Sequence, residues 1–367
     1  MAFFNSLLST LGYQRPSEFE NVPPEISSSR KHAEIPLPPE LIGHIASFLS
    51  PESAASFAIC CRSTYSTISS QSFKVLREKK LDRYKFLTLL ERQLPNYTLC
   101  YYCAKLHAID SAHRYLKLSD SSKDHLPCWE SDLELGTGYF VHSDFSFAVF
   151  QMTMKHYRLG QDCSELLNLL SKKPTTYLHY GYIERHTVLA KIIAGSMVLQ
   201  EQRVFMLPPD RALAIPWDLL VAICPHSRPL SASSFDDRGS IVISRITQGV
   251  LPKRHRSGII QCRHCLTEFK VNYKSFGERG NAMFFTRWLD LGQGQSATDQ
   301  NWRGHVRGIE FRRLSIAEWP LIPSHRGSVS AAFENQESLA FDFDPSLSSQ
   351  DDEELFRKSP YSWPSNV

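Results

Sequence analysis

Residues 35–68 read IPLPPELIGHIASFLSPESAASFAICCRSTYSTI and decide how the N-terminal part of the chain folds. Apolar side chains recur in the first half of this stretch at the spacing of one helix face. They are Leu41, Ile45, Phe48 and Leu49. Prolines precede them, where a first helical turn tolerates proline, and Ser50 with Pro51 has the pattern of a second helix start. The stretch therefore predicts two amphipathic helices with almost no linker between them.

Helical character continues beyond this stretch to about Leu94, where Pro95 ends it, so everything up to the first cysteine pair is expected to be helical. Further helices are expected at residues 145–159 and 164–170. Residues 182–192 and 196–206 are rich in β-branched and aromatic residues and flank Ala194-Gly195, which is the pattern of a β-hairpin. More short strands are expected at Ser240–Ile246, Gly258–Gln261, Thr267–Tyr273 and Ala282–Trp288.

These patterns indicate an α+β fold, in which an N-terminal helical segment precedes an α+β domain with a mainly antiparallel sheet. The predicted parts are a disordered leader at 1–34, the helical segment at 35–80, a helix and Cys-x-x-Cys linker region at 81–130, the α+β domain at 131–328 and a disordered acidic tail at 329–367. The leader and the tail are rich in Ser and in Pro or acidic residues and lack a sustained period.

The overall charge gives little support to a nucleic-acid or membrane partner. The 367 residues carry 41 Lys and Arg against 38 Asp and Glu, for a net charge of +3.

The apolar N-terminus has no basic region and is interrupted at Asn5 and Ser6, so a signal peptide is not expected. No apolar run approaches the roughly 18–20 residues that span a bilayer. The expected compartment is therefore the cytosol, the nucleus or both.

The nine cysteines include two Cys-x-x-Cys pairs, which in a reducing compartment favour metal ligation or buried thiols over disulfides. Cys262 and Cys265 stand between two predicted strands, and Cys224 and His226 flank a proline that would turn the chain. These four residues are predicted to converge on one point as a closed Cys₃His zinc site. The alternative is a set of small buried thiols that only pack.

The earlier pair follows the helix stop at Pro95 and lacks an obvious full set of ligands. Its predicted zinc ligands are Cys100, Cys103, His107 and Cys128, with His113 and His125 as substitutes. Neither pair opens a helix within a βαβ pattern, so a thioredoxin-like redox role is not expected.

The chain also has no phosphate-binding glycine loop, nucleophile elbow or HExxH helix. No catalytic residue is assigned, and the chain is expected not to be an enzyme.

The segment that begins at Leu37 resembles the F-box, which opens with Leu-Pro, continues with an acidic-apolar pair and ends its first helix with Phe-Leu. The matching residues are Leu37, Pro38, Glu40, Leu41, Ile45, Phe48 and Leu49. The second helix departs from the pattern, because it reads Ser53-Ala54 in place of an acidic-leucine pair and Tyr65 in place of a tryptophan.

The F-box resemblance implies a surface for a Skp-type adaptor, the protein that joins an F-box protein to a cullin scaffold in a ubiquitin ligase. The residues implied are Leu37, Pro38, Leu41, Ile45, Phe48 and Leu49. So short a helical pair cannot bury its whole apolar face internally, so part of it is expected to stay reachable. The alternative is an ordinary helical hairpin packed on its own domain.

Five segments in order, LPPELIGHIASFL, CYYCAKLH, ICPH, CRHCLTEFKV and RGNAMFFTRWLDLG, are similar to a group of fungal F-box proteins with a Cys/His-containing C-terminal domain. This resemblance covers roughly residues 35–310. It implies an adaptor of an SCF-type ligase that recruits a protein substrate through its C-terminal domain. The alternatives are a zinc-stabilised nucleic-acid-binding protein and an interaction protein that works outside any ligase.

Overall fold

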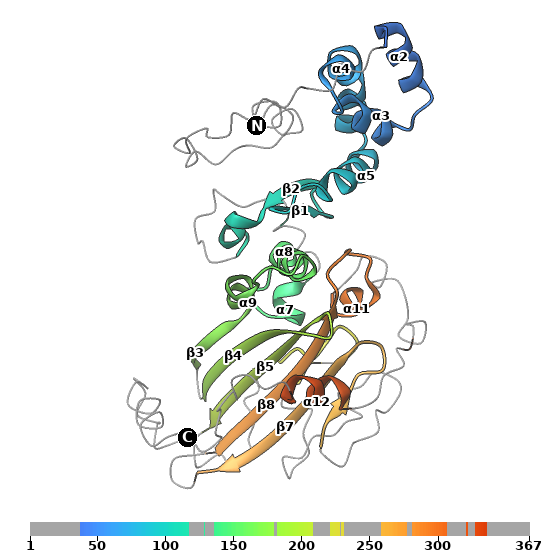
Figure 1. The fold of residues 1–367 in the computed structure, drawn as a ribbon. Coiled ribbons are helices and arrows are strands. Elements are labelled where there is room, and N and C mark those ends of the chain that lie inside the picture. Colours follow the sequence, from blue (N-terminus) through green and yellow to red (C-terminus); the bar gives the residue numbers. More distant parts are fainter. Residues whose placement is uncertain are drawn as a thin grey trace, which may run out of the picture. The chain divides into compact units, whose positions relative to one another are not determined.

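The computed structural model describes residues 37–116, 128, 136–179, 182–207, 221–227, 229–230, 258–276, 281–306, 321 and 327–335 (Figure 1). The chain forms two compact units, Met1–Ala112 and His113–Val367. The predicted leader at 1–34, the predicted strand at 240–246 and the predicted tail from residue 336 lie outside the described residues.

The first unit is a set of helices followed by a small strand pair. Its elements are α2 (Pro39–Ser47), α3 (Pro51–Ala58), α4 (Arg62–Glu78), α5 (Lys80–Glu91), β1 (Tyr97–Cys100) and β2 (Lys105–Ala108). Helices α2 and α3 each begin with a proline at the first position, where no backbone donor is needed. The core that joins α3, α4, α5 and both strands consists of Ala55, Phe73, Leu76, Phe86, Leu87, Leu99 and Leu106.

The strand pair corrects the prediction that this part is helical up to the first cysteine pair. β1 ends at Cys100 and pairs antiparallel with β2, with Leu99 opposite Leu106. Both leucines are buried in the helical core, at 4% and 2% exposure, so the pairing is driven by tertiary packing that the sequence pattern did not show. A 3-10 helix, η2 (Ile109–Tyr115), follows β2.

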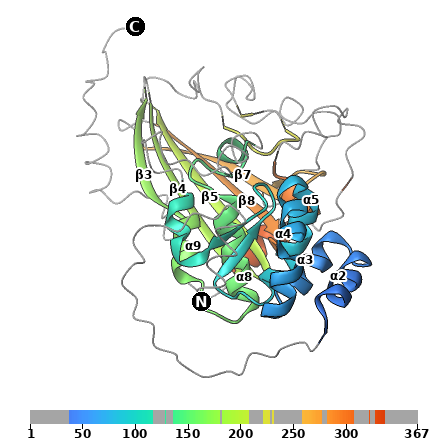
Figure 2. The ribbon, with the colours of Figure 1, turned by 90° about the horizontal axis from the view of Figure 1, so that it is seen from above.

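The second unit is built on one antiparallel sheet in the order β3-β4-β5-β8-β7-β6. Its strands are β3 (Lys172–His179), β4 (Tyr182–Ile193), β5 (Ser196–Leu207), β6 (Ile260–Gln261), β7 (Thr267–Ser275) and β8 (Asn281–Gly292). Figure 2 shows β3, β4, β5 and β8 side by side in this order. The predicted hairpin is confirmed, since β4 and β5 meet at Ala194 and Gly195, whose φ angles of 48° and 82° suit a tight two-residue turn.

Short helices accompany the sheet. They are α7 (Thr137–Phe140), α8 (Phe147–Arg158), α9 (Ser164–Leu170), α11 (Gln300–Arg303) and α12 (Ser328–Glu334). Helices α8 and α9 lie near the end of the sheet where β3 begins, and α12 lies against the sheet over β8 (Figure 1). The α+β architecture with a mainly antiparallel sheet is thus confirmed. None of the described helices is long and apolar enough to cross a membrane.

Helix α12 shows that the disordered tail was predicted to begin too early. Val329 and Phe333 lie one turn apart and are buried against Trp288 and Val198 of the sheet. The backbone N–H of Ser330 donates a 2.9 Å hydrogen bond to Glu268 on β7. These tertiary contacts fold a short segment whose polar neighbourhood suggested disorder.

Strand β3 was not predicted either. Its lysines and Pro174 are untypical of a central strand, and it lies at the edge of the sheet, where proline is tolerated.

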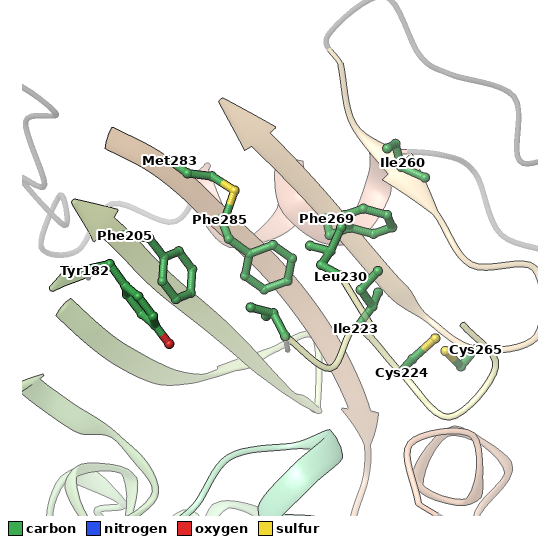
Figure 3. Close-up of a cluster of buried hydrophobic side chains, with 11 residues drawn as sticks. Tyr182, Phe205, Ile223, Cys224, Leu230, Ile260, Cys265, Phe269, Met283 and Phe285 are labelled. Carbon is green, nitrogen blue, oxygen red and sulfur yellow. The ribbon is translucent and has the colours of Figure 1, made fainter. Parts of the chain in front are cut away.

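The two faces of the sheet carry different side chains because successive residues alternate. One face presents Phe205, Met283, Phe285 and Arg287, and the segment from Val221 to Leu230 packs on it. Figure 3 shows Ile223 and Leu230 from that segment beside Phe285 and Phe269, with Cys224 and Cys265 at the edge of the same cluster. We call this the arginine face of the sheet. The other face presents Val204, Phe284 and Trp288, and carries α12.

One histidine near α9, His142, is buried without a charged form that its surroundings would stabilise. The His142 side chain is fully buried, with Nε2 3.0 Å from the Leu170 carbonyl and Nδ1 3.3 Å from the Asp144 N–H. The carbonyl accepts from Nε2 and the N–H donates to Nδ1, so the ring is neutral. Burial lowers the pKa of His142 to about 3.

We predict that the unfolding free energy of the second unit decreases as pH falls below about 6.5, the pKa of an unfolded histidine. The unfolded chain then binds a proton that folded His142 rejects, so the site contributes a slope of up to about 1.4 kcal/mol per pH unit. His142→Gln keeps a donor for the Leu170 carbonyl but does not titrate, so its slope should be smaller. All six tryptophans follow residue 113, so urea unfolding followed by tryptophan fluorescence at pH 7 and pH 5 reports on this unit. Equal slopes in the two proteins would contradict the assignment.

Candidate partner-binding surface and metal sites

Helix α2 of the first unit keeps most of its apolar side chains outside the core. Only Ile42 is buried, at 1% exposure, where it packs with Ala58 and Ile68. The large apolar residues that remain around the helix are Leu37, Leu41, Ile45, Phe48 and Leu49, with exposures of 36%, 48%, 39%, 76% and 37%. We call these five residues the α2 surface. Pro38, the sixth residue predicted for this surface, is also exposed.

The spacing of the α2 surface gives it the form of a stripe. Leu41 and Ile45 are one turn apart, so they lie on the same side of the helix, and the Phe48 ring meets that of His44 edge-on at 4.9 Å. A short helix that buries a single side chain gains little from its own unit. Exposed apolar side chains grouped in this way are typical of partner surfaces, and anchors at this spacing suit a helix-binding groove.

In the second unit, the structure brings together all four residues of the late Cys/His group. Cys224 and His226 come from the turn after Ile223, and Cys262 and Cys265 come from the turn between β6 and β7. Their ligand atoms all lie within 4.8 Å of one another. A tetrahedral zinc ion with bonds of about 2.3 Å to sulfur requires sulfur atoms roughly 3.8 Å apart, so this donor set fits the ion.

The two turns that carry these ligands are held by their own backbone hydrogen bonds. The Cys262 N–H donates to the Thr267 carbonyl at 2.9 Å, and the His264 N–H points at the Cys262 sulfur at 3.4 Å. The hydrogen bond with Cys224 raises the pKa of Cys262 above its usual value, and the His264 N–H offsets this only in part. The other turn is closed by a 3.2 Å bond from the Ser227 N–H to the Cys224 carbonyl. The ligand positions are therefore fixed by the fold.

The thiols of the late group influence one another's protonation. Burial acts to raise the pKa of Cys224, but hydrogen bonds from Cys262, Cys265 and His226 outweigh it and hold that pKa well below its usual value. Burial and the neighbouring Cys224 raise the pKa of Cys265 well above its usual value. The protein groups thus favour one thiolate, and a divalent cation at the centre would stabilise all three.

In the first unit, Cys100, Cys103 and His107 form a second group whose ligand atoms lie within 4.8 Å. Cys100 ends β1 and His107 lies in β2, with the Cys103 sulfur 3.3 Å from His107 Nε2. Ala104 closes the turn with a φ of 48° and donates its N–H to the Cys100 carbonyl at 3.0 Å. Three donors leave one position of a tetrahedral shell open.

The fourth ligand predicted for the early group, Cys128, stays a prediction. Cys128 and the substitute His113 belong to the second unit, whereas the three assembled ligands lie in the first. The substitute His125 lies outside the described residues.

Sequence reasoning missed a buried charged cluster on the arginine face. The Arg287 side chain is fully buried and its Nε donates to Glu201, whose other oxygen lies 2.8 Å from both His186 Nε2 and Arg203 Nε. Burial acts to raise the pKa of Glu201, but Arg287, Arg203 and His186 outweigh it and hold that pKa well below its usual value. The sequence of β8 did contain one indication of this cluster. Alternate residues of a strand share a face, so Arg287 falls on the same side as the apolar Phe285 and Leu289.

Comparison with known proteins adds one finding. Residues 36–76 match the family model of the F-box domain. The matched range begins just before Leu37, contains α2 and α3 and ends within α4, so it includes the whole α2 surface. No curated protein and no solved structure matches the chain. The chain therefore contains an F-box domain, and this domain lies in the first unit.

We predict that the α2 surface contributes little to folding. Ile42→Ala should lower the unfolding free energy of the first unit by about 2–4 kcal/mol, because it opens a cavity between α2 and α4. Phe48→Ala should change it by less than about 0.5 kcal/mol, because the ring is largely exposed. Amide hydrogen exchange in peptides from residues 62–78 measures both effects. Equal loss of protection in the two variants would show that Phe48 belongs to the core.

Proposed function

We propose that this chain is a substrate adaptor of an SCF-type ubiquitin ligase. The observation that carries the proposal is the α2 surface, five apolar residues exposed within the range that matches the F-box domain. F-box domains typically bind Skp-type adaptors, which connect them to a cullin scaffold. The α2 surface would be the contact with that adaptor, through Leu37, Pro38, Leu41, Ile45, Phe48 and Leu49.

The energetics favour such a contact. Full burial of one leucine or phenylalanine side chain contributes about 1.5–3 kcal/mol, and a few well-buried anchors usually dominate an interface. Phe48 and Leu41 have the largest exposures on the α2 surface, so they have the most area to bury. The Ala-rich α3 adds less area, which makes α2 the main source of affinity.

The second unit would recruit the protein substrate. In this arrangement the chain acts by binding, because other ligase subunits transfer ubiquitin to a protein that the adaptor holds nearby. The second unit has its own core and its own sheet, so it can present a surface independently of the F-box helices. Such a ligase would operate in the cytosol or the nucleus, which agrees with the cysteine chemistry of the chain.

We also propose that both Cys/His groups hold structural zinc. Cys224, His226, Cys262 and Cys265 would supply a closed four-ligand shell, and Cys100, Cys103 and His107 would supply three ligands of a second one. Zinc suits this set because sulfur and imidazole nitrogen are its preferred protein ligands. A closed site binds only the assembled ligands, so its binding energy stabilises the folded unit.

We predict that Leu41→Glu with Phe48→Glu abolishes co-purification of the Skp-type adaptor and the cullin, because two carboxylates would replace the main apolar anchors. Affinity purification of the tagged full chain followed by mass spectrometry measures this. Leu81→Glu is the matched control, since Leu81 is exposed at 66% on α5 and lies outside the matched range. Retained adaptor in the double variant, or equal loss with Leu81→Glu, would contradict the assignment.

We predict that Cys262→Ser releases about one equivalent of zinc from the purified full chain and lowers the melting temperature of the second unit. The Skp-type adaptor should still bind, because the F-box domain lies in the other unit. Cys163→Ser is the control, since Cys163 is buried and belongs to neither group. Elemental analysis and tryptophan-detected melting measure the two effects. Unchanged zinc content in Cys262→Ser would exclude a metal at this group.

A further inference from the structure

The guanidinium of Arg287 is bound by more than its ion pair with Glu201. Its remaining donors reach four main-chain carbonyls. These are Phe140 at 2.9 Å, Val141 at 2.5 Å, Ala222 at 2.9 Å and Ile223 at 2.8 Å. Arginine supplies five N–H donors in a rigid plane, so one side chain can hold several segments in a fixed arrangement.

Two of these carbonyls belong to the residues just before the metal ligand Cys224. Ala222 and Ile223 are therefore held on the sheet by Arg287 from one side of the turn. The two ends of the same segment are joined by a pair of backbone hydrogen bonds, at 2.9 and 2.8 Å, between Val221 before the turn and Leu230 after it. The Cys224–His226 turn thus projects from a base that is fixed at both ends.

The other ligand pair is held by the same strand, β8, through its backbone. Thr267, two residues after Cys265, pairs with Leu289, and the Asp290 N–H donates to the Leu266 carbonyl at 3.0 Å. β8 therefore holds one ligand pair through the Arg287 side chain and the other through main-chain pairing. The distance between the two pairs depends on where Arg287 holds Ala222 and Ile223.

We propose that Arg287 is a positioning residue for metal binding, and that it assembles the Cys₃His group before the metal arrives. This inference rests on the zinc proposed for Cys224, His226, Cys262 and Cys265. Without the guanidinium, the Cys224 turn would have to be ordered by the metal itself, and part of the binding energy would be used for that ordering. Groups outside the ligand shell that orient ligands typically change metal affinity by about 10–100-fold.

The substitution that tests this role is Arg287→Lys. Lysine keeps a positive charge beside Glu201, but its single ammonium cannot reach the four carbonyls together. Arg203→Lys is the matched control, because Arg203 pairs with the same Glu201 and its salt bridges involve Glu201 and Glu184 only among the described contacts. Both variants disturb the charged cluster, and only the first releases the segment before Cys224.

The readout is cobalt(II) affinity, measured from thiolate-to-cobalt absorption in competition with a chelator. The full chain carries Cys100→Ser and Cys103→Ser so that only the late group reports. We expect Arg287→Lys to weaken cobalt binding about 10–100-fold and Arg203→Lys to leave it near the value of the parent chain. Unchanged affinity in Arg287→Lys, or equal loss in both variants, would overturn the positioning role.

A second pair of variants covers the case in which Arg287→Lys fails to fold. Arg287→Gln combined with Glu201→Gln removes both buried charges together, so no unpaired charge is left behind. It should bind cobalt as weakly as Arg287→Lys, whereas Arg203→Gln, which keeps the ion pair between Arg287 and Glu201, should bind close to normally. Equal affinity in these two proteins would overturn the inference. A parent chain that binds no cobalt would overturn the metal site itself, while adaptor binding through α2 would be unaffected.

Discussion

The second unit depends on one buried ion pair, between Arg287 of β8 and Glu201 of β5. A guanidinium with no solvent contact is tolerated only if its charge is compensated and its donors are satisfied. Here a carboxylate and four carbonyls meet these needs, and they come from β5, from α7 and the residue after it, and from the segment before Cys224. The segments that surround the sheet are therefore required to converge on one point of the arginine face. The proposed metal would lie next to the Ala222–Ile223 segment, where Cys224 and Cys265 border the apolar cluster (Figure 3).

The first unit differs from the second because a large part of its apolar surface stays exposed. Its core is formed by α3, α4, α5 and the strand pair, and α2 contributes only Ile42 to the buried residues. The exposed side of α2 has little reason to be apolar unless a partner covers it, since exposed leucine and phenylalanine gain nothing in water. A stable helical support with an apolar outer stripe is what a docking module requires. The exposed apolar stripe of the first unit suits the proposed task of joining a ligase.

The sequence was most informative where local signals agreed. Pro39 and Pro51 marked helix starts, and Ala194-Gly195 marked the hairpin that joins β4 to β5. The late Cys/His group could be predicted because two turns each offered ligands two or three residues apart. The elements that the sequence did not predict depend on contacts between distant segments. Strands β1 and β2 form because Leu99 and Leu106 are buried by the helices, and α12 forms because Phe333 is buried beside Trp288. The role of Arg287 likewise required knowing which carbonyls lie opposite β8, and spacing along the chain does not reveal that.

The central claim is that the α2 surface is the binding site of a Skp-type adaptor, and photo-crosslinking from position 48 tests it most directly. A photoreactive phenylalanine analogue in place of Phe48 keeps the ring and samples whatever covers it in the cell. The account predicts that the crosslinked protein is a Skp-type adaptor and that this species carries a cullin. Crosslinks only to the second unit of the same chain, or only to proteins unrelated to a ubiquitin ligase, would contradict the account and return α2 to the role of an internal packing helix.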